Sequence, residues 1–319
     1  MCKHDGFFCV RASRLLRKAA SVSLRSQLRY APFMISRRSQ QADHLPLADG
    51  HTVPVYRWVP NRPNASNFGD ELGPMIVRAL LARHGKHHLQ VIDAPSVNRS
   101  KLLSVGSIIH NARKGDVIWG AGINGKAWPK HVTGKMGIVV TAVRGPLTRQ
   151  ALKACGVDAP EVFGDPGLLF PRLFADEIER AIRKRRSAGP TGGILYVPNL
   201  NDERLMSTDH LVLAADIRSV SPGLAPWDVA AEIAVADLVL ASSLHGIVLA
   251  EALGIPVRPI ASLFEPAFKY IDYFLGTGRP SPVFSTSIPQ ALQSTDLPAP
   301  VFDATALMNA FPHEMLDLA

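Results

Sequence analysis

The stretch LVLASSLHGIVLAEALGIPV, residues 238–257, contains the clearest structural pattern in the chain. It opens with the unbroken apolar run LVLA, which is typical of a strand buried on both faces of a parallel sheet. The run stops at SSLHG, and residues 246–254 then have the composition of a helix. A strand, a turn and a helix in this order predict a unit of parallel α/β structure.

The same alternation extends outward from this stretch in both directions. Strands are predicted at residues 53–59, 89–93, 101–109, 116–123, 137–143, 161–167, 193–199, 238–242 and 255–260. Helices are predicted at residues 74–85, 146–156, 227–236, 246–254 and 265–276. A charged helix with Gly and Pro at its end, residues 176–193, has the composition of a linker between domains.

These patterns predict an α/β protein with two Rossmann-like, doubly wound domains that face a cleft, a GT-B-like architecture. The expected divisions are a basic, flexible N-terminal extension over residues 1–45, an N-terminal domain over 46–185, and a C-terminal domain with a short tail over 186–319. Sheets of this type bind ligands at the carboxyl ends of their strands.

Composition limits the function classes. The chain has 319 residues and a net charge of +8, but residues 1–45 hold nine Lys or Arg against two Asp, and the remainder holds 26 basic and 25 acidic residues. A nearly neutral body argues against nucleic-acid binding. The three cysteines, an odd number without a CxxC pair, argue against a disulfide framework or a zinc site. No transmembrane helix is evident.

The basic N-terminal extension leaves three interpretations open. It is an amphipathic segment that contacts anionic lipid, a disordered extension, or the product of an upstream start codon that is not used.

The SSLHG turn raises the question of why a histidine stands at the end of a buried strand. Ser242 and Ser243 are placed to cap the helix expected from Gly246. A helix N-terminus favours an anion, so His245 would stand beside an anionic ligand as a proton donor. The alternative is a capping serine with a histidine that bonds only to the backbone.

Two further motifs contain polar residues at strand ends. In TAVRGPLT, Arg144 precedes a Gly-Pro helix start and could hold a carboxylate or phosphate with paired hydrogen bonds, or lie on the surface. In NFGDELGP, Gly69 allows close approach of a ligand, and Asp70 either orients a sugar hydroxyl or, as the pattern favours, caps the coming helix.

Two glycine-containing turns carry weaker signals. WGAGINGK formally matches GxGxxG, but no helix opens after it as a dinucleotide site requires, so Gly120 and Gly122 either line the cleft or form a hairpin turn. FGDPGLL contains Asp165 followed by Pro and Gly, a sequence typical of turns, and we assign it a structural role.

Taken in order, NFGDELGP, GAGI, TAVRGPLT, FGDPGLLFP, SSLHGIVLAEALGIPV and FKYIDYF resemble the polysaccharide pyruvyl transferase family. They look most like the ketal-pyruvate transferases of bacterial exopolysaccharide synthesis. The resemblance implies transfer of the enolpyruvyl unit of phosphoenolpyruvate to a sugar, forming a pyruvate ketal, with no metal and no cofactor beyond the donor substrate. The N-terminal domain would hold the acceptor and the C-terminal domain the donor.

The resemblance also implies roles for particular residues. His245 and Arg144 match the histidine and the N-domain arginine of the family, as general acid/base and as anion ligand. In the Arg-Leu-His turn of related enzymes, the arginine is replaced here by Ser243, so either Lys269 or Arg258 would supply the missing charge or the donor would differ. The expected substrate-binding residues are Asn67, Gly69, Asp70, Gly120, Gly122, Ser242, Ser243, Leu244, Gly246 and Lys269.

The implied partners are phosphoenolpyruvate and a sugar or lipid-linked oligosaccharide, with a cytoplasmic location and peripheral contact with the inner membrane. Two alternatives remain at this stage. One is a nucleotide-sugar glycosyltransferase of the same architecture, in which Glu251 would bind the donor ribose. The other is a two-domain sugar- or peptide-binding protein, in which His245 and Arg144 would share no cleft.

Overall fold

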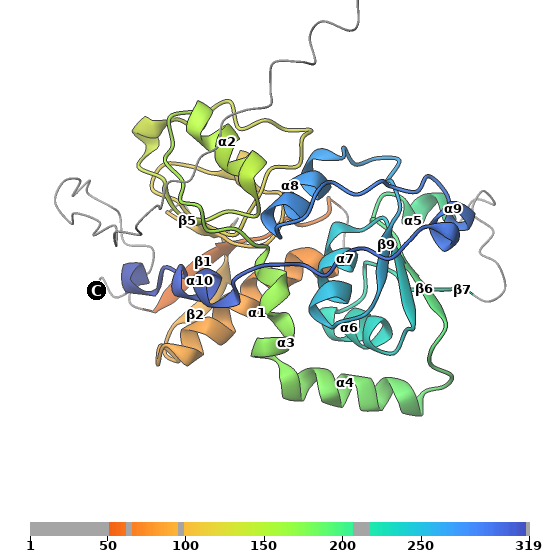
Figure 1. Cartoon of the computed structure of the whole chain (residues 1–319). Coiled ribbons are helices and arrows are strands. Elements are labelled where there is room, and N and C mark those ends of the chain that lie inside the picture. The colour runs from red at the N-terminus through yellow and green to blue at the C-terminus, as the bar shows by residue number, and fades with distance from the viewer. Residues whose placement is uncertain (1–50, 62–65, 95–98, 207–216, 317–319) are drawn as a thin grey trace, which may run out of the picture. The chain divides into compact units, whose positions relative to one another are not determined.

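Two all-parallel sheets organise the chain (Figure 1). The structure, a computed structural model, describes residues 51–61, 66–94, 99–206 and 217–316, so the predicted N-terminal extension lies outside the described residues. Both sheets belong to one unit, Ala42–Ala319.

The first sheet has the order β2-β1-β3-β4-β5 and the second has the order β7-β6-β8-β9. The strands of the first sheet are β1 Thr52–Tyr56, β2 Gln90–Asp93, β3 Leu102–Leu103, β4 Val117–Trp119 and β5 Val139–Ala142. Those of the second are β6 Ile194–Val197, β7 Ile217–Ser219, β8 Leu238–Ala241 and β9 Val257–Pro259. The LVLA run is therefore a central strand, flanked on both sides and buried, as its composition predicts.

Helices connect and cover these strands. The α-helices are α1 Phe68–Arg83, α2 Pro146–Ala154, α3 Phe170–Leu173, α4 Ala175–Ser187, α5 Glu203–Met206, α6 Pro226–Ala234, α7 Leu244–Ala252, α8 Phe268–Gly276, α9 Ile288–Gln293 and α10 Ala304–Asn309. Short 3₁₀ turns are η2 Ile109–Asn111, η3 Gly134–Met136, η4 Pro166–Leu169 and η5 His313–Leu316. The predicted α/β class with parallel sheets is confirmed, whereas the cleft-facing, two-domain arrangement stays a prediction.

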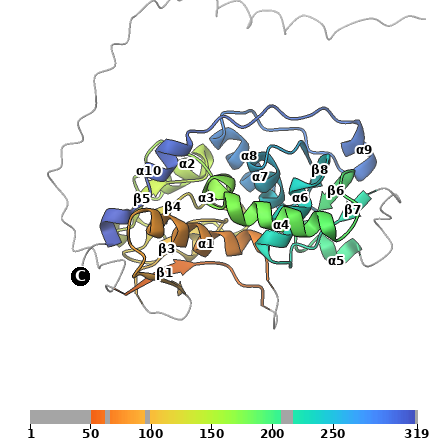
Figure 2. The ribbon, with the colours of Figure 1, turned by 90° about the horizontal axis from the view of Figure 1, so that it is seen from below.

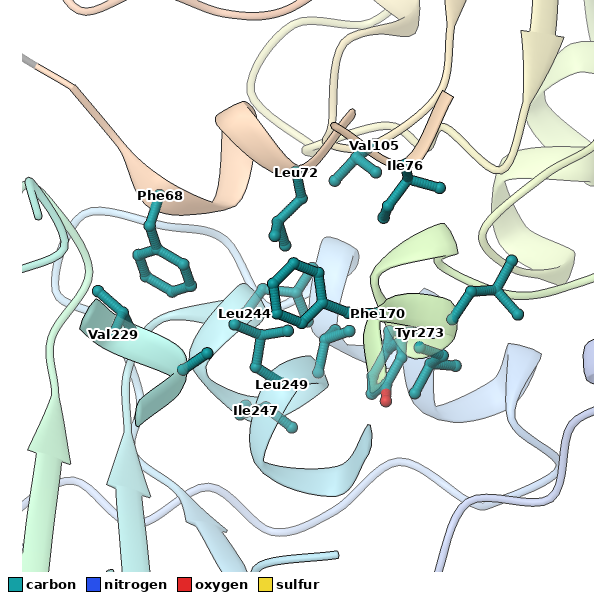
Figure 3. Packing of buried hydrophobic residues seen from close by; sticks show 14 of the residues in the cluster. Phe68, Leu72, Ile76, Val105, Phe170, Val229, Leu244, Ile247, Leu249 and Tyr273 are labelled. Atoms are coloured by element: carbon teal, nitrogen blue, oxygen red, sulfur yellow. The ribbon is translucent and has the colours of Figure 1, made fainter. Parts of the chain in front are cut away.

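One buried apolar cluster draws side chains from the elements around both sheets. Figure 3 shows Leu72 from α1, Phe170 from α3 and Leu249 from α7 meeting in it. These side chains are fully buried, and each large apolar side chain buried in this way contributes roughly 1.5–3 kcal/mol relative to exposure. The helices that carry the candidate site are therefore anchored by the core.

Several predicted boundaries are wrong, and the strand predicted at residues 161–167 is reduced to an isolated bridge at Phe163 before η4. The first helix begins at Phe68, before the predicted start at Pro74, because Asn67 caps it by accepting a hydrogen bond from the Gly69 N–H. Pro74 lies inside α1 rather than in its first turn. The predicted strand at residues 101–109 shortens to Leu102–Leu103, and the chain beyond it turns toward the site.

The charged helix that the composition marks as a linker, α4, packs against α6. Its Arg185 pairs with Glu232 of α6, and its Ile178 is buried. The end of the chain returns from the second sheet to the first, as the path from α9 to α10 shows (Figures 1 and 2). There the indole N–H of Trp119 donates to the carbonyl of Leu307, at 2.8 Å.

Two kinds of feature are absent from the described ranges. No helix in them combines the length and the apolar character that a bilayer span requires. No group of three or more His, Cys, Asp or Glu side chains in those ranges is arranged to hold a metal ion.

Candidate active site

A cavity of about 250 Å³ lies where the carboxyl ends of strands from both sheets converge. Its lining from the first sheet follows β1, β3 and β4: Trp58, Asn67, Asp70, Ser107, Ile108, His110, Asn124 and Lys126. Its lining from the second sheet follows β6, β8 and β9: Asn199, Leu200, Asn201, Ser243, Leu244, His245, Glu265 and Lys269.

Sheet topology explains why the cavity forms there. In an open parallel sheet, the connections leave in opposite directions at the point where the strand order reverses, which opens a crevice. The first sheet reverses between β1 and β3, and the second between β6 and β8. The segments that follow all four of these strands line the cavity.

The SSLHG turn begins α7 at Leu244, two residues before the predicted start at Gly246. Ser243 is the cap, and its hydroxyl accepts the Gly246 N–H at 3.2 Å. Ser242 has a different role, because its hydroxyl bonds to Tyr196 and to the Asn199 N–H, beneath the cavity surface. His245 therefore lies in the first turn of α7, where the helix dipole favours negative charge.

The imidazole of His245 packs against α1. A Cβ added at Gly69 would lie 1.9 Å from Nδ1 of His245, so only glycine permits this approach. Gly69 thus leaves space for the histidine side chain, whereas the sequence predicts that a ligand approaches this glycine. Gly246 has a similar packing role, because an added Cβ would meet Val197 at 2.8 Å.

The side chain of His245 has a strongly lowered pKa. Burial, followed by the positive charges of Lys269 and Arg144, lowers its pKa from 6.5 to about 3. Its Nε2 is buried without a hydrogen-bond partner and faces Oδ2 of Asp165 at 3.7 Å. The imidazole is therefore neutral at neutral pH, and so low a pKa makes it a weak base.

Arg144 lies beneath the cavity and is not part of its lining. Its side chain is fully buried and donates to the hydroxyl of Ser107 at 2.7 Å and the carbonyl of Ile123 at 2.6 Å. It also pairs with Asp272 of α8 at 3.4 Å. The structure thus brings Arg144 and His245 close enough for electrostatic interaction, but only His245 reaches the cavity.

The glycines of the GAGI turn explain how Arg144 is accommodated. A Cβ at Gly122 would lie 2.4 Å from Cζ of Arg144. Gly120 has a φ of +83°, and a Cβ there would meet Pro166 at 2.4 Å. Both residues allow tight packing below the cavity and do not line it.

Asp70 and Asn67 line the cavity from α1. The predicted capping role belongs to Asn67, which leaves the Asp70 carboxyl free to face the cavity. Burial raises the pKa of Asp70 from 3.8 to about 7, although the nearby Lys269 acts in the opposite direction. Asp70 therefore retains a proton in a large fraction of molecules at neutral pH.

Two lysines provide positive charge at the cavity. Glu265 bridges them, at 2.5 Å from Lys126 and 3.0 Å from Lys269. Burial lowers the pKa of Lys269, and Glu265 opposes this shift. Arg258, the other candidate for the missing charge, instead bonds to Asp296 and to the α9 carbonyls of Ala291 and Leu292.

Several lining residues carry no recognisable local signal in the sequence. Lys126, His110, Asn199, Asn201, Glu265 and Trp58 fall in this group. Lys126, His110, Asn201 and Glu265 follow predicted strands, and Trp58 and Asn199 lie at or next to the last position of a predicted strand, so position at or after a strand end is the signal that could have found them. Trp58 is 39% exposed at the cavity and offers a flat face to a ligand.

Glu251, which the glycosyltransferase alternative assigns to ribose binding, forms a buried ion pair outside the cavity. Its two oxygens pair with the guanidinium of Arg279 at 2.5 and 2.9 Å, and Tyr273 donates to it. The carboxylate is 5% exposed and does not line the cavity. Its role is to hold α7 to the segment after α8.

Comparisons with known proteins identify the family. A solved structure of a functionally uncharacterised protein from Klebsiella pneumoniae subsp. pneumoniae NTUH-K2044 matches with a TM-score of 0.42 and 15% identity, over 74% of this chain and 93% of that one. A search of curated proteins found no significant match. The family model of polysaccharide pyruvyl transferase matches residues 67–262, from the cap of α1 past the SSLHG turn. The chain belongs to the polysaccharide pyruvyl transferase family.

Proposed function

We propose that this protein transfers the enolpyruvyl unit of phosphoenolpyruvate to a sugar of a polysaccharide repeat and closes it into a pyruvate ketal. Family membership supports the reaction class. The observation that carries the proposal is the chemistry of the cavity, where a neutral histidine and a proton-bearing carboxyl stand beside two lysines.

Cavity size favours a small donor. A volume of about 250 Å³ lies below the roughly 300–1,000 Å³ of pockets that enclose drug-sized ligands. A three-carbon phosphorylated acid suits this space better than a nucleotide sugar. The acceptor sugar would lie toward the exposed indole of Trp58.

Ser243 stands where related enzymes have an arginine, and Lys269 supplies the positive charge that this replacement removes. It lines the cavity on the same side as the first turn of α7, whose backbone N–H groups favour an anion. Lys126 adds a second cation through the shared carboxylate of Glu265. The phosphate and carboxylate of the donor would compete with Glu265 for these ammonium groups.

The pKa values suggest how protons move. A site in which two groups are shifted in opposite directions commonly uses one as acid and the other as base. The negative charges of the bound donor would raise the pKa of His245, which would then accept the proton of the attacking hydroxyl, and Asp70, protonated, would deliver a proton to C3 of the donor. The first hydroxyl oxygen then bonds to C2, and phosphate leaves as its bond to C2 breaks. The second hydroxyl closes the ketal at C2 and gives its proton to the phosphate, and His245 returns its proton to Asp70. General acid–base catalysis of this kind contributes about 10²–10⁴-fold.

The test is incubation of the purified protein with phosphoenolpyruvate and candidate saccharide acceptors. We expect phosphate release that depends on the acceptor, and a new ketal methyl signal in the proton NMR spectrum of the product. His245→Gln should reduce the rate at least about 10²-fold. His87→Gln, a substitution of an exposed histidine after α1, is the matched control and should leave the rate unchanged. Full activity of the His245→Gln protein would remove this proposal.

The acceptor and the location extend the same proposal. If the acceptor is lipid-linked, the basic residues of 1–45 would hold the enzyme near anionic lipid. A protein that starts at residue 44 should then lose sedimentation with anionic liposomes while retaining activity on a soluble acceptor. Equal sedimentation of the full and shortened proteins would contradict the membrane contact.

A further inference from the structure

Two buried polar atoms face each other beneath the cavity without a hydrogen bond. Oδ2 of Asp165 and Nε2 of His245 are both buried and unpartnered, and they lie 3.7 Å apart. Burying a polar group without a partner is unfavourable, so native proteins rarely retain such groups without a reason.

The other oxygen of Asp165 is already committed. Oδ1 accepts the Gly167 N–H at 2.9 Å and caps η4. This bond fixes the carboxyl plane and directs Oδ2 toward the imidazole. The turn chemistry of FGDPG therefore accounts for one oxygen of Asp165 and leaves the second without a structural role.

We propose that Asp165 is a positioning residue that holds His245 in the Nε2–H tautomer and so leaves Nδ1 unprotonated on the Gly69 side. The Nε2 proton would be donated to Oδ2 of Asp165 after a small rotation of the imidazole, since the present 3.7 Å exceeds a normal hydrogen bond. A carboxylate that orients a histidine in this way selects the nitrogen that acts as base. The kinetic part of this inference rests on the proposed function, whereas the tautomer itself does not.

The surrounding charges are consistent with this tautomer. Burial raises the pKa of Asp165 to about 6, with Gly167 and Arg144 acting in the opposite direction, and the pKa of His245 is about 3. Above pH 6 the pair is therefore a carboxylate and a neutral imidazole. The other charged or titratable groups that act on the pair are Arg144, Lys269 and Tyr273.

The first test measures the tautomer directly in the protein without substrate. In protein labelled with ¹⁵N in its histidine rings, the His245 signals are identified by their loss in His245→Gln. At pH 7.5 we expect a protonated Nε2 and an unprotonated Nδ1. A protonated Nδ1 in the wild-type protein would overturn the inference whether or not any variant folds.

The second test uses Asp165→Asn, which can still accept the Gly167 N–H. Its amide would donate to Nε2 and shift the proton to Nδ1, as seen in the NMR spectrum. We expect kcat at pH 7.5 to fall about 10²–10⁴-fold, while KM for phosphoenolpyruvate changes by less than about 3-fold.

The matched control is Asp303→Asn, which makes the same chemical change at the cap of α10, where the carboxylate accepts two backbone N–H groups. It should alter neither tautomer nor kcat. An unchanged tautomer in Asp165→Asn would overturn the inference, and so would an unchanged kcat. A tautomer shift in a protein that shows no pyruvyl transfer would instead refute the proposed function and leave the positioning role standing.

Discussion

The guanidinium of Arg144 connects two loops of the first sheet to helix α8. It donates to Ser107 and Ile123, and it pairs with Asp272, whose carboxylate also receives the N–H and hydroxyl of Thr148. Arg144→Ala would leave the Asp272 carboxylate buried without its cation. We expect the free energy of unfolding, measured by urea denaturation, to fall by roughly 3–5 kcal/mol.

A second substitution separates stability from binding. Asp272→Asn added to Arg144→Ala removes the unpaired buried charge. The double variant should therefore recover part of the lost free energy of unfolding, as a double-mutant cycle would show. If Arg144→Ala is instead as stable as the wild-type protein but inactive, Arg144 contacts the substrate directly.

The carboxyl of Asp70 makes the stability of the protein depend on pH. Its folded pKa of about 7 lies above its ordinary value of 3.8, so the folded state binds the proton more tightly. The associated stability is complete below pH 3.8 and is lost as the pH rises through 7. Asp70→Asn, which cannot ionise, should therefore raise the free energy of unfolding by roughly 1–3 kcal/mol at pH 8 and by less at pH 5.

Denaturation curves at the two pH values provide the measurement. Asp176→Asn, at an exposed position in the first turn of α4, is the control and should show no such difference. Equal effects of Asp70→Asn at pH 5 and pH 8 would show that the carboxyl is not buried as the structure describes.

At the scale of elements, helix α1 and helix α7 meet through a glycine and a histidine. Gly69→Ala would place a methyl group on the imidazole of His245, because the added Cβ lies 1.9 Å from Nδ1. Alanine suits a helix better than glycine, so α1 should still form. We expect kcat to fall about 10²-fold, since misplacement of a reacting group by about 1 Å has that effect.

Gly73→Ala, in the next turn of α1, is the control for this experiment. Its added Cβ would meet the hydroxyl of Ser104 at 2.9 Å and not the histidine. Both variants are compared by steady-state kinetics and thermal melting. A Gly69→Ala protein with normal kcat would mean that the position of the imidazole does not matter for turnover.

The sequence predicts most elements because their patterns are local. Buried central strands such as LVLA are unbroken apolar runs, and the parallel α/β class follows from their alternation with helices. The start of α1 is not predicted, because Pro74 suits a first turn and the Asn67 cap lies within a run of turn residues. The strand at β3 is overestimated, because SVGSII is apolar enough to extend it although it turns away after Leu103.

The candidate site is predicted only in part, for a related reason. Asn67, Asp70, Ser243, Leu244, His245 and Lys269 are expected residues that line the cavity. Whether a buried cation faces a ligand or a carboxylate depends on partners distant in sequence, as Arg144 and Asp272 show. The same holds for Asp165, since its turn is local and its contact with His245 is not.

At the scale of the molecule, the reversal points of two parallel sheets supply one cavity. Neither sheet carries the proposed chemistry alone, because Asp70 follows β1 whereas His245 and Lys269 follow β8 and β9. A ligand bound there contacts segments from both sheets at once. Such a ligand binds the folded protein and not the unfolded chain, so it must raise the melting temperature.

Thermal melting with added ligands therefore tests the donor. Phosphoenolpyruvate at about 100 times its Kd should stabilise the protein by about 2.7 kcal/mol, whereas UDP- and GDP-sugars should not change the melting temperature. Lys269→Gln should abolish the shift, because it removes the cation that replaces the family arginine beside the first turn of α7. Lys153→Gln, on the exposed side of α2, is the matched control and should keep the shift. Stabilisation by nucleotide sugars without any effect of phosphoenolpyruvate would assign this cavity to a different donor.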